Sequence, residues 1–222
     1  MRVVVNAATS VDGKLSTHER EQVDISGTGD FERVDRLRAE SDAVMVGVGT
    51  VVADDPSLTV KDPDLRAQRT ERGDPANPAR VVADSRIRTP PNASILDEEA
   101  DSFLLVSEAA PGDFITQMEE NGATVIVAGQ NRVDLPAAFD RLESSGIDQL
   151  MVEGGGELIF SLFADGLVDR LSVYVGSLVI GGREAPTLAD GDGFTNAEEF
   201  PALDLESVDQ LDGGIVLEYD VD

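Results

Sequence analysis

Apolar and polar positions along the chain follow two different periods. Short runs of branched apolar residues predict β-strands, and longer stretches with apolar residues three or four positions apart predict helices. Through the first three quarters of the chain the two kinds of element alternate. The predicted strands are Val3–Ala8, Ala43–Val48, Arg80–Ala83, Phe103–Val106, Thr124–Val127 and Gln149–Val152, and the predicted helices span 30–40, 113–121, 135–145 and 158–163.

The last quarter of the chain follows a different pattern. Leu171–Ile180 predicts a strand, and Leu203–Leu211 and Ile215–Val221 flank an Asp-Gly-Gly turn, which is typical of a half-exposed antiparallel hairpin. Helix–strand alternation followed by antiparallel strands predicts one α/β domain over residues 1–222, with a mixed, mostly parallel sheet flanked by helices. The polar, proline-rich residues 61–79 predict an exposed excursion from that domain.

The charged residues give the chain a strongly negative field. There are 44 acidic and 17 basic residues, for a net charge of −27 at pH 7. This field repels nucleic acids and anionic membranes, so we expect neither as a partner. Scarce lysine, abundant aspartate and the absence of tryptophan are typical of a halophilic cytoplasmic protein. An acidic protein of an organism that does not live in salt is the alternative.

Cysteine and histidine usage narrows the possible chemistry. The chain has no cysteine and one histidine, His18, so we expect no disulfide and no zinc or copper site, and the sequence predicts no metal. We find neither a signal peptide nor an apolar run long enough to span a membrane, so we expect a cytoplasmic protein.

Three unusual loops follow predicted strands, where α/β proteins bind ligands. Residues 47–56 hold two glycines and Thr50 before a helical turn, and residues 153–157 hold three glycines between a strand and a helix. Bare N–H groups and the dipole of a helix N-terminus suit a pyrophosphate at the second loop. In the third loop, Arg86 and Arg88 suit the 2′-phosphate of NADPH. Glycine turns for packing and surface ion pairs for the arginines are the alternatives.

One lysine stands out after the first predicted strand. Lys14 follows an Asp12-Gly13 turn and is one of two lysines in the chain, the other being Lys61. Because arginine carries almost all of the positive charge, a retained ammonium indicates a compact point charge directed at an oxygen or a proton in transit. A solvated surface lysine is the alternative, and nearby His18 is interpreted as a loop residue.

Taken together, the loops resemble those of the riboflavin-pathway reductases, most closely the stand-alone archaeal members. That family has the dihydrofolate reductase-like fold, binds NADPH and commonly forms homodimers, so the resemblance implies these properties here, with NADH as a possible substitute. The motifs run in order over nearly the whole chain. They are NAATSVDGKL at 6–15, SDAVMVGVGTVVADDPSLT at 41–59, PARVVADSRIRTP at 78–90, EGGGEL at 153–158, LVDRLSVYV at 167–175 and GGREAPT at 181–187.

The resemblance also implies a reaction and a site. A ribosylamino group on a pyrimidine opens to an imine, and hydride from the nicotinamide adds to its carbon 1′ to give a ribitylamino chain. Lys14 and Glu153 are the expected catalytic residues, which polarise and protonate the opening ribose. The implied cofactor contacts are Thr50, Asp54, Ser85, Arg86, Ile87, Arg88, Gly154, Gly155 and Gly156, and the implied substrate contacts are Asn6, Ser10, Asp12, Asp55 and Thr59.

Several functions stay open at this point. Bacterial relatives fuse this domain to a zinc deaminase whose signature requires cysteines, which this chain lacks. A stand-alone reductase of the diamino pyrimidine is therefore favoured over one acting on the deaminated 5-amino-6-(5-phosphoribosylamino)uracil. A dihydrofolate reductase and a non-catalytic nucleotide-binding protein of the same fold are the remaining alternatives.

Overall fold

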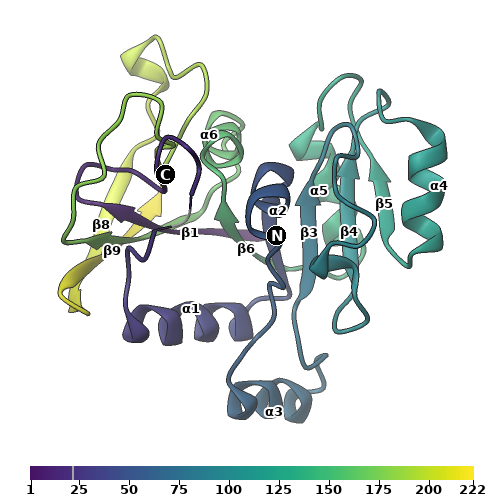
Figure 1. Ribbon diagram of the computed structural model, residues 1–222, viewed down its shortest axis with the longest axis horizontal. Coiled ribbons are helices and arrows are strands. Elements are labelled where there is room, and N and C mark those ends of the chain that lie inside the picture. The colour runs from purple at the N-terminus through teal and green to yellow at the C-terminus, as the bar shows by residue number, and fades with distance from the viewer. Residues whose placement is uncertain (22) are drawn as a thin grey trace. The chain divides into compact units, whose positions relative to one another are not determined.

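The computed structural model describes residues 1–21 and 23–222, which divide into two compact units (Figure 1). The first unit contains Met1 and residues 35–151, and the second contains residues 2–34 and 152–222. Helix α1 (Thr28–Glu40) and strand β6 (Gln149–Gly154) each begin in one unit and end in the other. The second unit is therefore built from two segments that are distant in the sequence, whereas the first is almost entirely one continuous segment.

The first unit is a parallel sheet with helices. Its neighbouring strands, in the order β5-β4-β3-β2, pair in parallel throughout, and α4 packs beside β5 (Figure 1). Branched apolar side chains fill the strands, and Met45, Leu104 and Leu105 are completely buried. The elements are β2 (Ala43–Gly47), α2 (Val48–Asp54), α3 (Pro63–Arg72), β3 (Ala79–Ala83), a 3₁₀ helix η1 (Ser94–Leu96), β4 (Ser102–Val106), α4 (Gly112–Glu120), β5 (Thr124–Val127) and α5 (Leu135–Ser144).

The second unit combines parallel and antiparallel pairing. Strand β1 pairs in parallel with β7, while β9 pairs antiparallel with both β7 and β8. Tyr174 and Val216 belong to its core, together with Ile25. Its elements are β1 (Arg2–Ser10), α6 (Gly156–Ala164), β7 (Arg170–Gly176), a 3₁₀ helix η2 (Ala197–Glu199), β8 (Leu203–Leu211) and β9 (Gly214–Val221). The α/β class with a mostly parallel sheet and an antiparallel C-terminal hairpin is confirmed, while a single domain over 1–222 stays a prediction.

Local sequence signals predicted some helix starts correctly. The helix predicted over 135–145 is present as α5, and Asp134 caps it, because its carboxylate accepts a hydrogen bond from the Ala137 N–H at 3.0 Å. Side-chain capping of this kind satisfies an N–H group that the first turn leaves without a partner. Among the described residues, no helix combines the length and the apolar content that crossing a membrane requires.

Two predictions need correction. Residues 61–79 are more than an exposed excursion, because they contain α3. This helix has a capping Asp62, which accepts from the Asp64 N–H at 2.8 Å, and its Arg69 is buried. Strand β7 ends at Gly176 and does not continue to Ile180. The Ile180 and Gly181 N–H groups bond instead to Asp12 in the turn that follows β1.

Candidate active site

The turn that follows β1 is built around Ser10. The Ser10 N–H donates to the Lys14 carbonyl at 2.9 Å, and the Lys14 N–H donates to the Ser10 hydroxyl oxygen at 3.0 Å. The same hydroxyl donates to the Asp12 carboxylate at 2.6 Å, and Ser10 is completely buried. Ser10 was predicted to contact substrate; in this structure its hydroxyl organises the turn that carries Lys14.

Asp12 joins this turn to the chain beyond β7. Its carboxylate accepts hydrogen bonds from the Ile180 N–H at 3.0 Å and the Gly181 N–H at 2.8 Å, in addition to the bond from Ser10. The hydrogen bond from Ser10 and those from the two backbone N–H groups lower the pKa of the Asp12 carboxyl to about 2. These bonds explain the early end of β7, because the Ile180 and Gly181 N–H groups turn toward Asp12.

The stability that Asp12 contributes should depend on pH. Its pKa lies below the ordinary value of 3.8, so the contribution is fully present above about pH 4 and is lost as the pH falls toward about 2. We expect the difference in Tm between the wild type and Asp12→Asn to be largest near neutral pH and to shrink across that interval. Thermal melts followed by circular dichroism measure this difference. A difference that stays constant down to about pH 2 would contradict the expectation.

Lys14 is held against a second segment of the same unit. Its ammonium, on a half-buried side chain, donates to the Ala185 carbonyl at 3.0 Å. The backbone of Lys14 forms an antiparallel bridge with Thr187, and the neighbouring Leu15 N–H donates to the Pro186 carbonyl at 2.9 Å. Lys14 is therefore a positioned side chain and not a freely solvated one, although two of its three N–H donors remain available beyond the bond to Ala185.

The glycine-rich junction is tighter than predicted. Strand β6 continues to Gly154 and α6 begins at Gly156, so that Gly155 alone lies between them, as a cap without a side chain. Gly154 has a positive φ of 133°, and a Cβ atom there would meet nothing within 4 Å. The Gly154–Gly155 peptide bond is cis. Glu153 is half-buried near the end of β6. The junction leaves the start of α6 without a side-chain cap and Gly154 beside open space.

Gly156 has a packing role. A Cβ atom there would lie 2.3 Å from the Thr187 carbonyl oxygen and 3.0 Å from a carboxylate oxygen of Asp190. The Asp190 N–H also donates to the Gly156 carbonyl at 3.1 Å. Residues 185–190 thus contact both Lys14 and the first residue of α6, and the second unit alone brings the predicted lysine and the glycine loop into one connected structure.

Asn6 occupies a buried polar network in the same unit. Its amide oxygen accepts from the Arg33 guanidinium at 2.8 Å, and Arg33 also donates to the Ser172 hydroxyl at 2.6 Å and forms an ion pair with Asp30 at 2.8 Å. Asn6 is only 5% exposed. Its amide NH₂ group and the second lone pair of its oxygen are the atoms that can still serve the predicted substrate contact.

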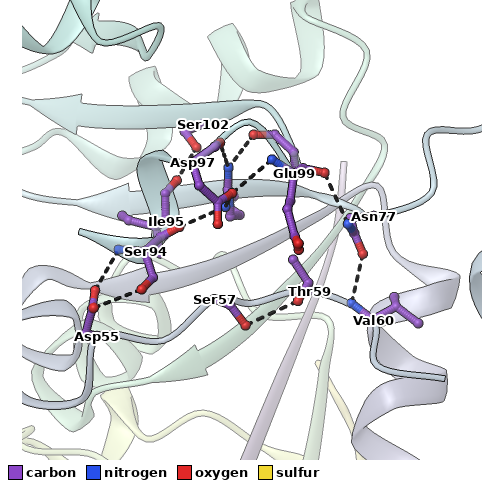
Figure 2. Close-up of polar contacts among 12 residues, drawn as sticks. Asp55, Ser57, Thr59, Val60, Asn77, Ser94, Ile95, Asp97, Glu99 and Ser102 are labelled. Carbon is purple, nitrogen blue, oxygen red and sulfur yellow. Dashed lines mark hydrogen bonds and ion pairs between the residues drawn. The ribbon is translucent and has the colours of Figure 1, made fainter. Parts of the chain in front are cut away.

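In the first unit, the residues after α2 include two of the predicted substrate contacts, Asp55 and Thr59 (Figure 2). Asp55 adopts the left-handed conformation with φ of 41°, and its two carboxylate oxygens accept from the Ser94 N–H at 2.7 Å and the Ser94 hydroxyl at 2.8 Å. Asp55 therefore ties the end of α2 to η1. Desolvation raises the pKa of the adjacent Asp54 carboxyl, and Thr50 is half-buried in α2.

The loop that Asp55 binds is supported from within the sheet. Arg80 on β3 is completely buried and donates to the Ser94 carbonyl at 3.1 Å and to the Asp97 carboxylate at 2.7 Å. Carbonyls and a carboxylate satisfy its two terminal nitrogens, whereas its buried Nε–H has no partner among the described residues. The positions of η1 and of Asp55 therefore depend on a side chain of the sheet that sequence reasoning did not single out.

Lys61, the second lysine of the chain, is bound to two hydroxyl groups. Its ammonium donates to the Ser57 hydroxyl at 2.6 Å and to the Thr59 hydroxyl at 2.8 Å. Those two hydroxyls lie 3.2 Å apart, and Figure 2 shows this contact. Thr59, a predicted substrate contact, is buried, while Lys61 is exposed. Lysine is scarce in this chain, and the scarcity that made Lys14 a candidate functional residue could have made Lys61 a candidate as well.

The arginine loop after β3 is shaped by Asp84. One carboxylate oxygen of this completely buried residue accepts from the Arg88 N–H at 2.6 Å and from the Thr89 N–H at 2.7 Å. Ile87, a predicted cofactor contact, is buried with φ of 52°, whereas Arg86 and Arg88 on either side of it are exposed. The loop therefore directs both guanidinium groups outward and uses Ile87 for packing.

Ser85 is engaged by two neighbouring loops. Its hydroxyl accepts from the Val133 N–H at 3.0 Å, and its carbonyl accepts from the Ser107 hydroxyl at 2.8 Å. The hydroxyl hydrogen of Ser85 remains able to donate to a ligand. Among the described residues, no three histidine, aspartate or glutamate side chains gather as a metal-binding group.

A mixed, mostly parallel α/β sheet with a glycine junction at the end of a strand is the architecture in which proteins of this class bind ligands at the carboxyl ends of the strands. Comparison with known families is consistent with this architecture, because the model of the RibD C-terminal domain matches residues 1–217. The chain belongs to this family, and the predicted resemblance to the riboflavin-pathway reductases is confirmed.

The relatives include two archaeal proteins of similar length. The chain is 50% identical over 192 residues to the 2,5-diamino-6-ribosylamino-4(3H)-pyrimidinone 5′-phosphate reductase of Archaeoglobus fulgidus, covering 86% of this chain and 87% of the relative. It is 42% identical over 219 residues to the protein of the same name from Methanothermobacter thermautotrophicus, covering 99% and 97%. It is also 32% identical over 221 residues to the riboflavin biosynthesis protein RibD of Actinobacillus pleuropneumoniae, covering 98% of this chain and 56% of that protein.

Solved structures share the fold. A pyrimidine reductase-like protein from Corynebacterium diphtheriae superimposes with a TM-score of 0.86 at 21% identity, covering 100% of this chain and 92% of the other. Dihydrofolate reductase from Enterococcus faecalis reaches a TM-score of 0.50 at 10% identity, covering 100% and 96%. The predicted dihydrofolate reductase-like fold is confirmed, and the roles of the individual site residues stay predictions.

Proposed function

We propose that the protein reduces the ribosylamino side chain of 2,5-diamino-6-(5-phosphoribosylamino)pyrimidin-4(3H)-one to the ribitylamino form, in riboflavin biosynthesis and with NADPH as the reductant. The strongest support is the 42% identity over 219 residues to an archaeal relative named for this substrate, a match that spans nearly all of both chains. The connection of Lys14 to the glycine junction within one unit agrees with this chemistry.

Each unit by itself carries groups that suit one part of a dinucleotide. The start of α6 has no side-chain cap and Gly154 borders open space, so its N–H groups suit a pyrophosphate, while exposed Arg86 and Arg88 suit a 2′-phosphate. When bound, NADPH would supply the hydride that reduces carbon 1′. NADH is the alternative reductant, because it lacks only the 2′-phosphate that the arginine pair would contact.

In this proposal, side chains of the protein donate and accept the protons of the reaction. Lys14, whose ammonium already points a donor at the Ala185 carbonyl, would donate to the ribose ring oxygen as it leaves carbon 1′. Glu153 on β6 would share that proton. Lys61, beside the Ser57 and Thr59 hydroxyls, supplies a second ammonium suited to the substrate's phosphate.

A turnover assay separates this function from its alternatives. Oxidation of NADPH is followed by absorbance in molar KCl with the diamino pyrimidine, the deaminated pyrimidine and dihydrofolate side by side. We expect the diamino compound to give the highest kcat/KM. Preference for either of the other two would assign the chain to that reaction. Tight NADPH binding without turnover of any of them would favour a non-catalytic nucleotide-binding protein.

We also propose a cytoplasmic protein adapted to high salt, without nucleic-acid or membrane partners. Its charge of −27 supports this proposal, because like-charge repulsion of that size is relieved by screening ions.

A homodimer is proposed through the apolar face of the hairpin. Leu203, Leu205 and Val208 on β8 stand opposite Val221, Tyr219 and Leu217 on β9. The three β8 side chains are 41%, 55% and 54% exposed. In a chain of charge −27 this face carries no acid at those positions, so a second copy can pack there without opposing charges.

Leu205→Asp should convert the dimer into a monomer. In the dimer, the new carboxylate would be buried against an apolar surface and would face the same carboxylate of the second copy. Burying a charge without a partner of opposite charge costs much free energy. Light scattering coupled to size-exclusion chromatography in molar KCl measures the mass. Phe114→Asp, the same kind of change on exposed Phe114 of α4, is the control and should remain dimeric. A dimeric Leu205→Asp variant would reject this face.

A further inference from the structure

Residues Ala185–Asp190, called the strap here, lie between the two parts of the predicted site in the second unit. At one end the strap holds the lysine turn. The Lys14 ammonium donates to the Ala185 carbonyl at 3.0 Å, and the Leu15 N–H donates to the Pro186 carbonyl at 2.9 Å. These bonds come from the side chain and the backbone together, so they restrain the direction in which Lys14 extends.

At its other end the strap packs on the glycine junction. The Asp190 N–H donates to the Gly156 carbonyl at 3.1 Å, and the Thr187 carbonyl oxygen occupies the space that a Cβ on Gly156 would need, at 2.3 Å. Only a glycine permits so close an approach at this position. The start of α6 is thus in direct contact with the segment that holds Lys14.

Two side chains close the strap on itself. One carboxylate oxygen of Asp190 accepts from the Thr187 N–H at 3.1 Å and also from the Thr187 hydroxyl. Thr187 also forms the backbone bridge to Lys14. The lysine turn is therefore connected to α6 through the strap, which the hydrogen bonds between Thr187 and Asp190 close.

We propose that Thr187 and Asp190 are positioning residues for the reductase reaction. By closing the strap they hold the Lys14 ammonium at a fixed separation from the glycine junction, so that the proton donor faces the ribose ring oxygen of a substrate bound beside the cofactor loop. This inference rests on the proposed function for its catalytic consequence. The geometric part, the dependence of Lys14 on the strap, stands independently of it.

The first test measures the geometry of Lys14 without any substrate. The chain contains two lysines, Lys14 and Lys61, so limited acetylation followed by mass spectrometry reports both, with exposed Lys61 as the internal reference. In Thr187→Val and Asp190→Ala we expect the ratio of Lys14 to Lys61 modification rates to rise about fivefold, the change that loss of one ordinary hydrogen bond produces. Thr116→Val, which removes an exposed hydroxyl from α4, should leave the ratio unchanged.

The second test measures the consequence for turnover. A donor misplaced by about 1 Å costs on the order of 10²-fold in rate, so we expect kcat to fall by about 10- to 100-fold in Thr187→Val, with the Kd for NADPH changed by less than about threefold. Thr187→Ser keeps the hydroxyl and should recover most of the loss. A purely structural role predicts instead a lower Tm with no selective fall in kcat.

The outcomes separate the two proposals. An unchanged labelling ratio in folded variants overturns the positioning role, whatever the activity. If the wild type turns over none of the pyrimidines, the proposed function fails, while the labelling ratio still decides whether the strap holds Lys14. Should Thr187→Val or Asp190→Ala not fold, Asp190→Asn provides the milder change. Its neutral amide oxygen accepts weaker bonds from Thr187 than the carboxylate does, and an unchanged labelling ratio in that folded variant would overturn the positioning role.

Discussion

Replacing Lys14 with alanine is expected to lower kcat by about 10²–10⁴, the usual range for removal of a positioned proton-transfer group. The fold should survive, because the side chain is half-buried and makes one hydrogen bond, to the Ala185 carbonyl. Loss of that bond costs about 0.5–1.5 kcal/mol. Stopped-flow or steady-state NADPH oxidation measures the rate, and circular dichroism verifies the fold.

Lys14→Arg should restore little of this activity. A guanidinium can still reach a carbonyl such as that of Ala185, but it is planar, bulkier and always protonated, so it replaces the structural bond and not the proton donor. The arginine variant therefore separates the catalytic interpretation from a lysine that only fastens the turn. If kcat/KM falls less than about threefold in the alanine variant, under ~0.7 kcal/mol, the catalytic assignment is wrong.

The second large effect concerns the choice of reductant. Removing both Arg86 and Arg88 by alanine substitution should reduce the preference for NADPH over NADH by about ten- to a hundredfold, since a charge-assisted contact to the 2′-phosphate contributes about 1.5–3 kcal/mol. Both guanidinium groups are exposed, while Ile87 between them is buried. The fold of the loop should therefore be preserved in the double variant.

Fluorescence titration with each dinucleotide gives the two dissociation constants. Arg36→Ala combined with Arg141→Ala removes the same charge from exposed positions on α1 and α5, and it should leave the ratio of the two constants near the wild-type value. This control distinguishes a local contact from the general effect of a more negative chain. An unchanged ratio in the Arg86 and Arg88 double variant would remove the 2′-phosphate assignment.

Element types were predictable because local patterns carry them. The parallel strands of the first unit are runs of branched apolar residues, and the Asp134 cap marked the start of α5. The same signals were present and missed at α3, where Asp62 caps, Pro63 occupies the first turn and Gly73 ends the helix with φ of 95°. Polar composition concealed that helix, since its buried residue is Arg69, whose guanidinium donates to the Ala39 and Ser41 carbonyls.

The sequence motifs identified the predicted site residues as a group. They could not show which polar atoms of those residues already make hydrogen bonds within the protein. Asp12 and Asp55 were interpreted as substrate contacts, yet backbone N–H groups and serine hydroxyls occupy their carboxylates. Those donors come from residues 39 to 169 positions away for all bonds except the one from Ser10. A motif shows which side chain is present; it does not show which distant backbone group reaches that side chain.

By itself, the sequence determined the α/β class, the membership of a reductase family, the glycine junction, and the lysine and arginine positions, because motif spacing and apolar period are local properties of the chain. Tertiary structure alone decided that Thr187 and Asp190 lie between Lys14 and Gly156, that Asp84 turns the arginines outward, and that β7 ends at Gly176. Each of these depends on hydrogen bonds or contacts whose partners become neighbours only on folding, so no local period encodes them.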